Sequence, residues 1–200
     1  MGPSPGGVDL APRHSPARLA YEGRADPGRA GRTGVMSGKR AAAVAERRRD
    51  LIAATVATIH ARGSLDVTMA EIAGRAGVSP GLAHHYFGSK DGLISETLRH
   101  LLRGFFAQVR AEWDAARTPR ARVSGLVRAA FGPEQFAPET VSAWLSFYVL
   151  AQHDPGAGRL LRVYVRRLRT HLVVALRPLA GDEAEAIAEA AGALIDGVYL

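Results

Sequence analysis

The sequence contains no cysteine. Disulfide bonds and thiolate metal sites are therefore excluded, and the absence fits a cytoplasmic protein. Long apolar runs are also missing, because Arg, His or Gly interrupts each run well before the roughly 20 residues that a membrane helix needs. The N-terminus lacks the continuous apolar segment of a secretory signal. The sequence thus predicts neither a membrane-spanning nor a secreted protein, and we expect it in the cytoplasm.

Acidic residues are too few to balance the basic ones. The 200 residues include 26 Lys and Arg against 19 Asp and Glu, which gives a formal net charge of +7 at pH 7. A basic balance favours polyanionic partners, nucleic acid first and a membrane surface second. The arginine-rich run 159–177 is the feature that suggests the membrane surface. Its arginines alternate with Leu, Val and Tyr, as an ordinary exposed helix face also does.

Residues 1–40 differ from the rest of the chain. They are rich in Gly, Pro and Arg, and their few apolar residues follow no period. Such a segment buries too little surface to offset its ordering entropy, which predicts a disordered arm. The arm adds phosphate contacts, or it is an extension ahead of a true start at Met36. At the other end, the last apolar run reaches Leu200 without a cap or a polar tail, which favours a fragment.

Helical periodicity begins near Ala41. Apolar residues recur there at spacings of mostly three, four and seven, and no Asn-Gly or Asp-Gly turn joins two strand-like runs. We therefore predict an all-α fold. The expected helices cover residues 41–62, two short segments within 68–92, and then residues 90–116, 120–131, 142–153, 157–180 and 182–200.

The stretch TMAEIAGRAGVSPGLAHHYFGSKDG, residues 68–92, has the pattern of a helix-turn-helix. Thr68 and Glu71 have the spacing of a capping box. Gly77 supplies the left-handed residue that a tight turn between helices needs. Ser79 caps the second helix, and Pro80 suits its first position. A short helix, a turn of three to four residues with Gly, and a second helix follow one another.

In this geometry the second helix is the recognition helix, and its N-terminal part enters the major groove of DNA. Small residues and free amides at its start suit close approach to phosphates. One of the two adjacent histidines is expected to face the core, with Phe87 as a core anchor. The candidate DNA-binding residues are Arg48, Thr68, Ser79, Pro80, Gly81, Leu82, His84, His85, Tyr86 and Lys90.

Other interpretations of the same residues have less support. His84 and His85 diverge by about 100° on a helix, and no third ligand stands at a suitable spacing, so we predict no metal site. No Ser/His/Asp or phosphate-loop constellation appears, so we predict no catalytic residues and no enzyme activity. A purely structural αα-hairpin is the remaining alternative for residues 68–92.

Residues 47–93 resemble the DNA-binding domain of the TetR family of bacterial repressors. The resemblance rests on Thr68, on IAGRAGVS (72–79), on HYF (85–87) and on SKDGL (89–93). It implies a helix-turn-helix domain at 41–92, in which Thr68 and Lys90 contact phosphates. It also implies a helical ligand-binding and dimerisation domain at 93–200, a homodimer and a palindromic operator on double-stranded DNA. No cofactor is implied.

The later segments resemble one branch of that family more closely. GLISETLRHLLRGFFAQVRA, SAWLSFYVLAQHDP, RLLRVYVRRLRTHL and ALIDGV are similar to choline-responsive repressors of glycine betaine synthesis. The resemblance implies a small-molecule inducer, choline or a related quaternary ammonium. An unrelated hydrophobic inducer, acting in efflux or catabolic control, is the alternative. Residues 1–40 have no counterpart in the family, and the final helix that the family carries after ALIDG is missing.

Aromatic faces hold quaternary ammonium groups. Trp144 and Tyr148 are four residues apart and share a helix face. Asp196, in an apolar helix, could neutralise a bound cation or form a hydrogen bond at a dimer interface. Ordinary core packing is the other interpretation of each aromatic residue. The candidate ligand-binding residues are Trp113, Trp144, Phe147, Tyr148 and Asp196.

Overall fold

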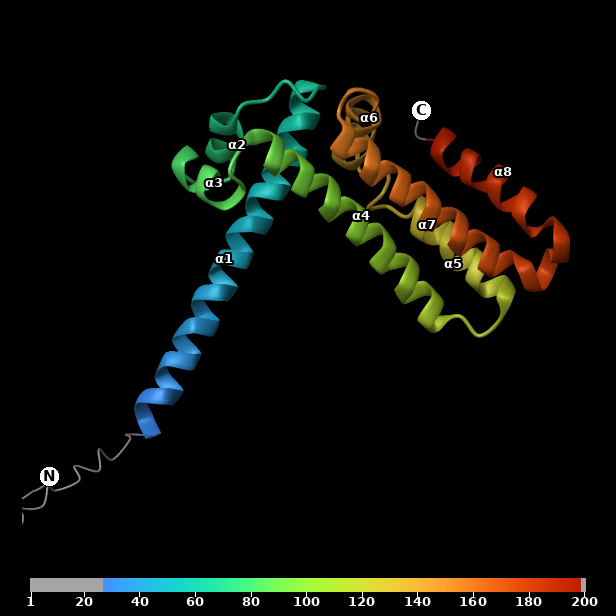
Figure 1. Cartoon of the computed structure of the whole chain (residues 1–200), viewed down its shortest axis with the longest axis horizontal. Helices are drawn as coiled ribbons and strands as arrows, with labels where there is room; N and C mark the ends of the chain where they lie inside the picture. Colours follow the sequence, from blue (N-terminus) through green and yellow to red (C-terminus); the bar gives the residue numbers. More distant parts are fainter. Residues whose placement is uncertain (1–26, 199–200) are drawn as a thin grey trace, which may run out of the picture. The chain divides into compact units, whose positions relative to one another are not determined.

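A computed structural model describes residues 27–198, with side-chain burial described from residue 40. Within that range all regular structure is helical, which confirms the all-α prediction. The helices in chain order are α1 (Pro27–Arg62), α2 (Met69–Arg75), α3 (Pro80–Phe87), α4 (Lys90–Ala115), α5 (Pro119–Phe131), α6 (Pro138–His153), α7 (Pro155–Ala180), the 3₁₀ turn η1 (Gly181–Glu183) and α8 (Ala184–Gly197). Figure 1 shows their order along the chain.

Helix α1 begins at Pro27 and not near residue 41. The predicted disordered arm, residues 1–40, therefore overlaps helix α1 at residues 27–40, and its remainder, residues 1–26, lies outside the described residues. Extending an existing helix costs much less than nucleating one, and proline suits a first helical position. Sequence periodicity detects only the amphipathic part of such a helix. Of the described residues, 27–41 and 42–198 belong to two separate units, and the sections below concern the second.

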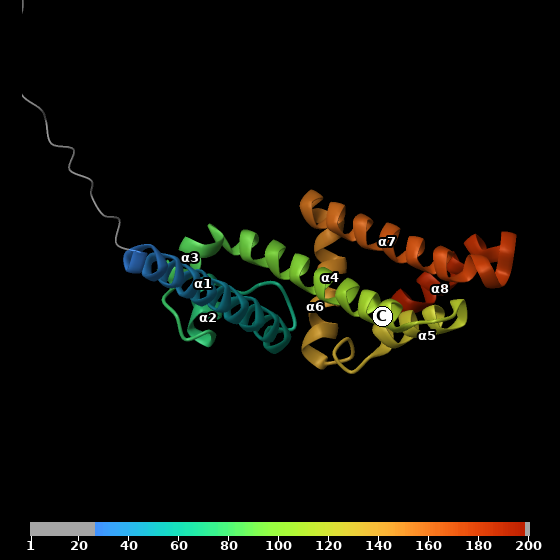
Figure 2. The same cartoon turned by 90° about the horizontal axis from the view of Figure 1, so that it is seen from below.

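Two hydrophobic clusters divide the second unit. The first cluster, here called the head, joins α1, α2, α3 and the start of α4. Its buried members are Leu51, Ile52, Ala54, Val67, Met69, Ile72, Ala73, Ala83 and Leu93. The second cluster, here called the body, begins at Ile94 and continues through α4 to α8. Helix α4 contributes to both clusters, so it links them directly, and Figure 2 shows it leaving α3 and running along α5.

Proline marks where several body helices begin. Pro119, Pro138 and Pro155 each stand in the first turn of a helix, α5, α6 and α7 respectively. In that turn the missing amide hydrogen would have no intrahelical partner, so proline costs nothing there. Thr118 and Asp154 cap α5 and α7 by accepting hydrogen bonds from Ala121 N and Ala157 N at 3.1 and 2.6 Å. Helices α7 and α8 then form an antiparallel hairpin (Figure 1).

Candidate nucleic-acid interface and ligand cavity

The turn between α2 and α3 has the capping groups that the sequence predicts. Thr68 Oγ1 accepts a hydrogen bond from Glu71 N at 3.1 Å, and Glu71 Oε2 accepts one from Thr68 N at 2.7 Å, which completes the capping box. Gly77 has a φ of 66°. Its N–H donates to Gly74 O, and Val78 N–H donates to Ala73 O, the pair of bonds that closes a helix around a left-handed residue. Ser79 Oγ then accepts from Leu82 N at 3.2 Å and caps α3.

Gly77 provides the first testable prediction. We expect Gly77→Ala to lower the free energy of unfolding by about 1–2 kcal/mol, because an L-residue is strained in the left-handed region. Nothing lies within 4 Å of a Cβ added at Gly77 or at Gly74, so crowding does not enter. Gly74→Ala, in the last turn of α2, is the matched control and should stabilise the protein by up to about 1 kcal/mol. Urea unfolding followed by circular dichroism measures both, and equal signs would contradict the prediction.

Helix α3 presents most of its predicted DNA-binding residues to solvent. Ser79, Pro80, Gly81, His84 and His85 are exposed, and only Ala83 is fully buried in the head. The expectation that one histidine faces the core is therefore wrong, because Ala83 takes the inward position. His84 Nδ1 donates to Gly88 O at 3.1 Å, which leaves its Nε2 available.

The remaining aromatic residues and Leu82 of α3 lie partly inside the head. Leu82, Tyr86 and Phe87 are half-buried, and both rings pack against the head cluster. Phe87 is thus a partial anchor where the sequence predicts a full one. The exposed predicted residues thus lie at the N-terminal part of α3 and at His84 and His85.

Arg48 has a structural role that the sequence does not reveal. Its Nη1 donates to Tyr86 O at 2.6 Å, and its guanidinium lies 4.4 Å from the centre of the Phe87 ring. A cation at a helix C-terminus is electrostatically favourable, so Arg48 fastens the end of α3 to α1. Lys90, half-buried, and Thr68, exposed, stand at the starts of α4 and α2. Helix starts are the usual positions for phosphate contacts.

The charges around the α2 cap are paired. Arg62 donates to Glu71 Oε1 and forms an ion pair with it. This hydrogen bond, together with those from Thr68, lowers the pKa of the Glu71 carboxyl to about 2. Glu71 therefore stays ionised at any physiological pH, and the capping box stays formed. The end of α1 is thereby tied to the start of α2.

A second candidate site lies inside the body. Phe105, Gln135, Trp144, Tyr148, Tyr164 and Ile195 line a cavity of about 10 Å³. The ring centre of Trp144 lies 5.3 Å from that of Tyr164 and 6.5 Å from that of Tyr148. The ring centre of Phe105 lies 5.8 Å from that of Tyr164. A volume of this size holds about one water molecule. A larger ligand would therefore have to displace part of the wall.

Asp196 stands behind the two tyrosines and is not part of the cavity wall. Tyr164 Oη donates to Asp196 Oδ1 at 2.9 Å, and Tyr148 also donates to this carboxylate. Burial raises the pKa of the Asp196 carboxyl, against the opposing effect of the two tyrosine hydrogen bonds. The charge of an ionised Asp196 makes both phenol rings more electron-rich. Electron-rich ring faces are what a cation prefers.

Two further predicted ligand residues, besides Asp196, do not line this cavity. Phe147 is 2% exposed and packs in the body core. Trp113 packs on His171, with ring centres 4.9 Å apart, and Arg122 lies over its ring. Helical spacing places Trp113 two turns beyond Phe105 on α4. Its buried Nε1 has no hydrogen-bond partner among residues 27–198.

Sequence reasoning missed four residues of the cavity wall. Phe105 comes from α4, Gln135 from the turn between α5 and α6, Tyr164 from α7 and Ile195 from α8. Each is unremarkable within its own helix or turn. The only available sequence signal is Tyr164 itself, a polar aromatic residue on the apolar face of an arginine-rich helix.

Possible metal ligands, helix length and the arginines of α7 bear on the metal and membrane interpretations. Among residues 27–198 no group of three or more His, Asp or Glu side chains could hold a metal ion. None of the helices in that range is both long enough and apolar enough to cross a bilayer. Several arginines of α7 have intramolecular partners: Arg167 lies 4.0 Å from the Phe106 ring centre, and Arg169 and Arg177 pair with Glu185.

Two protein families match this chain, one over the head and one over the body. Residues 51–97 match the bacterial regulatory proteins of the tetR family, and residues 119–200 match the C-terminal domain of BetI-type transcriptional repressors. The first match covers the α2–α3 pair and the ends of its neighbours. The second covers α5 to α8, which carry most of the cavity wall.

Individual relatives agree with these matches. The chain is 54% identical over 155 residues to the HTH-type transcriptional regulator BetI of Brucella anthropi, which covers 77% of this chain and 80% of that protein. The BetI of Rhizobium meliloti is also 54% identical, with 77% and 76% covered. A solved transcriptional regulator from Pseudomonas aeruginosa PAO1 is 30% identical, with a TM-score of 0.68 and 77% of each chain covered.

A more distant structure shares the fold. It is a transcriptional regulator from Saccharomonospora viridis, solved in complex with choline, with 24% identity and a TM-score of 0.69 over 78% of this chain and 84% of that one. Sequence identity to BetI proteins, by contrast, is high and extends over most of the chain. The chain therefore belongs to the TetR family of bacterial transcriptional regulators and has a BetI-type C-terminal domain.

Proposed function

We propose that the protein is a transcriptional repressor that leaves its operator when choline or a related quaternary ammonium binds in the body, and that it controls glycine betaine synthesis genes. The observation that carries this proposal is the group of three electron-rich rings, Trp144, Tyr148 and Tyr164, backed by the Asp196 carboxylate. Aromatic faces and a nearby negative charge are the combination that recognises a cation without hydrogen-bond donors. The choline complex of the Saccharomonospora viridis regulator supports the same ligand class.

The DNA-binding surface that we propose is the outer face of α3 with the starts of α2 and α4. Ser79, Gly81, His84 and His85 are exposed and lie at or near the helix end that enters a groove. Thr68 and Lys90 would contact phosphates on either side. A basic protein suits such a surface, and its DNA affinity should fall steeply with salt.

Dimerisation through α8 is part of this proposal. Ile187, Leu194 and Val198 are 39%, 66% and 50% exposed on one face of that helix. Apolar groups in such a row favour contact with a second copy. A two-fold dimer would present two α3 helices about one DNA turn apart, and the operator would then be palindromic.

Helix α6 links the proposed inducer site to the head. Its inner face carries Trp144 and Tyr148, and a hydrogen bond of 2.8 Å joins Ser142 Oγ on the same helix and His60 Nδ1 of α1. A ligand that enlarges the cavity would shift α6 and hence this contact. The ligand releases DNA only to the extent that it binds the released state more tightly.

Fluorescence anisotropy tests the proposed function. Labelled DNA, selected from a random pool by the protein itself, is titrated with protein and then with choline at constant ionic strength. We expect choline to release the DNA, with inositol, an uncharged polyol, as the control. Selection of a palindromic site that millimolar choline does not release would contradict the inducer and would favour an unrelated hydrophobic ligand. Failure to select any DNA would contradict the repressor.

The raised pKa of Asp196 predicts a pH dependence of ligand affinity. Burial raises this pKa, and a bound cation favours the ionised carboxylate. Choline affinity should therefore be full above the raised pKa and should fall as the pH drops through it. Isothermal titration calorimetry across a pH series measures the effect. Asp196→Asn is the control and should bind choline weakly at every pH, and a variant with an unchanged pH profile would contradict the prediction.

A further inference from the structure

The candidate ligand cavity is small, about 10 Å³, and a larger surface hollow shares part of its wall. This hollow, here called the vestibule, has a volume of about 280 Å³, and its lining includes His100, Gly104, Gln108, Glu134 and Thr140. Phe105 and Gln135 line both the vestibule and the cavity. These two side chains are therefore the wall that separates the cavity from the vestibule.

Of the two wall residues, Gln135 is the one that can move. Phe105 is 3% exposed and fixed in helix α4 among other core rings. Gln135 is 8% exposed but belongs to the turn between α5 and α6, where its N–H donates to Gly132 O at 3.0 Å. A side chain with several rotatable bonds on a turn can swing aside without unpacking a helix.

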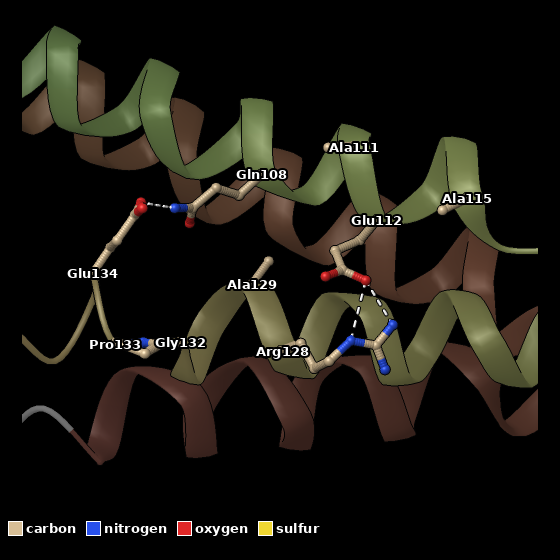
Figure 3. A pocket seen from close by; sticks show the side chains of 9 residues that line it. All are labelled: Gln108, Ala111, Glu112, Ala115, Arg128, Ala129, Gly132, Pro133 and Glu134. Carbon is tan, nitrogen blue, oxygen red and sulfur yellow. Dashed lines mark hydrogen bonds and ion pairs between the residues drawn. The ribbon is translucent and has the colours of Figure 1, made fainter.

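A chain of hydrogen bonds holds Gln135 in the closed position and ends on a carboxylate. Gln135 Nε2 donates to Gln108 Oε1 at 3.2 Å, and Gln108 Nε2 donates to Glu134 Oε2. Figure 3 shows the second of these bonds at one end of the neighbouring groove between α4 and α5. At the other end of that groove, Glu112 is neutralised by Arg128, whose Nη2 lies 2.6 Å from Glu112 Oε2.

Glu134 is therefore the carboxylate at the vestibule that lacks a basic partner in the described part of the chain. Its hydrogen-bond partner, Gln108, is neutral. An unbalanced negative charge at the mouth of a site raises the local concentration of cations and speeds their association. A cation that approaches Glu134 would also compete with Gln108 for the carboxylate, and the bond that holds Gln108 in place would weaken.

From this arrangement we infer that the vestibule is the entrance to the ligand cavity, that Glu134 attracts an organic cation to it, and that Gln135 is the gate. The inference rests on the proposed function, because it assumes that the cavity takes a cation. Glu134 acts on the rate of entry and not on the final contacts. Gln135 acts on entry and exit alike, since it lies across the path in both directions.

Stopped-flow tryptophan fluorescence tests the entrance, because Trp144 lines the cavity and reports its occupation. Choline and its uncharged analogue 3,3-dimethylbutan-1-ol are mixed with the full chain and with each variant. Glu134→Gln should slow the association of choline roughly three- to tenfold at low ionic strength and leave the uncharged analogue unaffected. The difference should shrink at high salt. Glu189→Gln removes the same charge from an exposed position on α8 and should change neither rate.

The gate is tested by Gln135→Ala and, as a second route, by Gln108→Ala, which removes the hydrogen-bond partner. Both should raise the association and dissociation rates of choline by about the same factor, roughly fivefold, and leave the Kd nearly unchanged. A change confined to the dissociation rate would make Gln135 a ligand contact and overturn the gate. Choline binding with unchanged association in Glu134→Gln would overturn the entrance alone, whereas no choline binding to the unaltered protein would overturn the proposed function and this inference with it.

Discussion

Trp144→Leu is expected to raise the Kd for choline about 30-fold and to leave operator affinity without choline unchanged. A desolvated cation–π contact with tryptophan is worth about 2 kcal/mol, and each 1.4 kcal/mol is tenfold in Kd. Trp144 is 6% exposed and lies between Tyr148 and Tyr164. Leucine keeps a smaller apolar side chain at the position, so the site stays apolar while the electron-rich ring is lost.

Trp113→Leu is the matched control for this experiment, because it makes the same chemical change outside the cavity. Trp113 packs on His171 instead, so its substitution should leave the choline Kd within about twofold of the unaltered protein, a difference below about 0.5 kcal/mol. Calorimetry gives both constants, and thermal unfolding verifies that both variants are folded. Equal losses of choline affinity in the two variants would show that the effect passes through general core packing and would contradict the assignment of Trp144.

Gly81→Glu is expected to lower DNA affinity about a thousandfold without disturbing the fold. Gly81 is exposed near the start of α3, its φ is outside the left-handed region, and nothing lies within 4 Å of an added Cβ. A carboxylate there is tolerated by the helix, since its N-terminus favours negative charge. On the DNA, the phosphates would repel this carboxylate at a position where glycine allows a close approach. We expect the free energy of DNA binding to weaken by about 2 kcal/mol for each subunit, and hence by about 4 kcal/mol for a dimer.

The control for Gly81→Glu is Gly104→Glu, which adds the same charge on α4 where an added Cβ also meets nothing within 4 Å. Gly104 lies at the vestibule and not in the head, so this variant should keep its operator affinity. Anisotropy titrations at several salt concentrations measure both variants. Retained sequence-specific binding by Gly81→Glu would mean that α3 does not enter the groove, and the proposed DNA-binding surface would be wrong.

The helix-turn-helix could be predicted from sequence because its signals are local. Thr68, Gly77 and Ser79 act on backbone groups within a few residues, through caps and a left-handed turn, and each has the predicted role in the structure. Exposure of α3 was less predictable. Whether a histidine faces inward depends on the rotation of the helix against the head, and here Ala83 takes the inward position while both histidines are exposed.

The ligand cavity, in contrast, depends on contacts between distant segments. Trp144 and Tyr148 were found because a single helix brings them to one face, and both line the cavity. Trp113 and Phe147 have the same chemistry but lie elsewhere, and Asp196 stands behind the tyrosines. No local pattern distinguishes these cases, because a ring in the core and a ring at a cavity have the same helical spacing.

Local patterns in the sequence were enough to predict that this chain is helical, that residues 68–92 contain two short helices joined by a tight turn, and which aromatic residues share a face of α6. Only the packing of the helices brings Phe105, Gln135, Tyr164 and Ile195 to those rings. The difference lies in the range of the forces involved. Capping and turn formation act over a few residues of chain, whereas a cavity exists only where several helices, far apart in sequence, fail to fill the space between them.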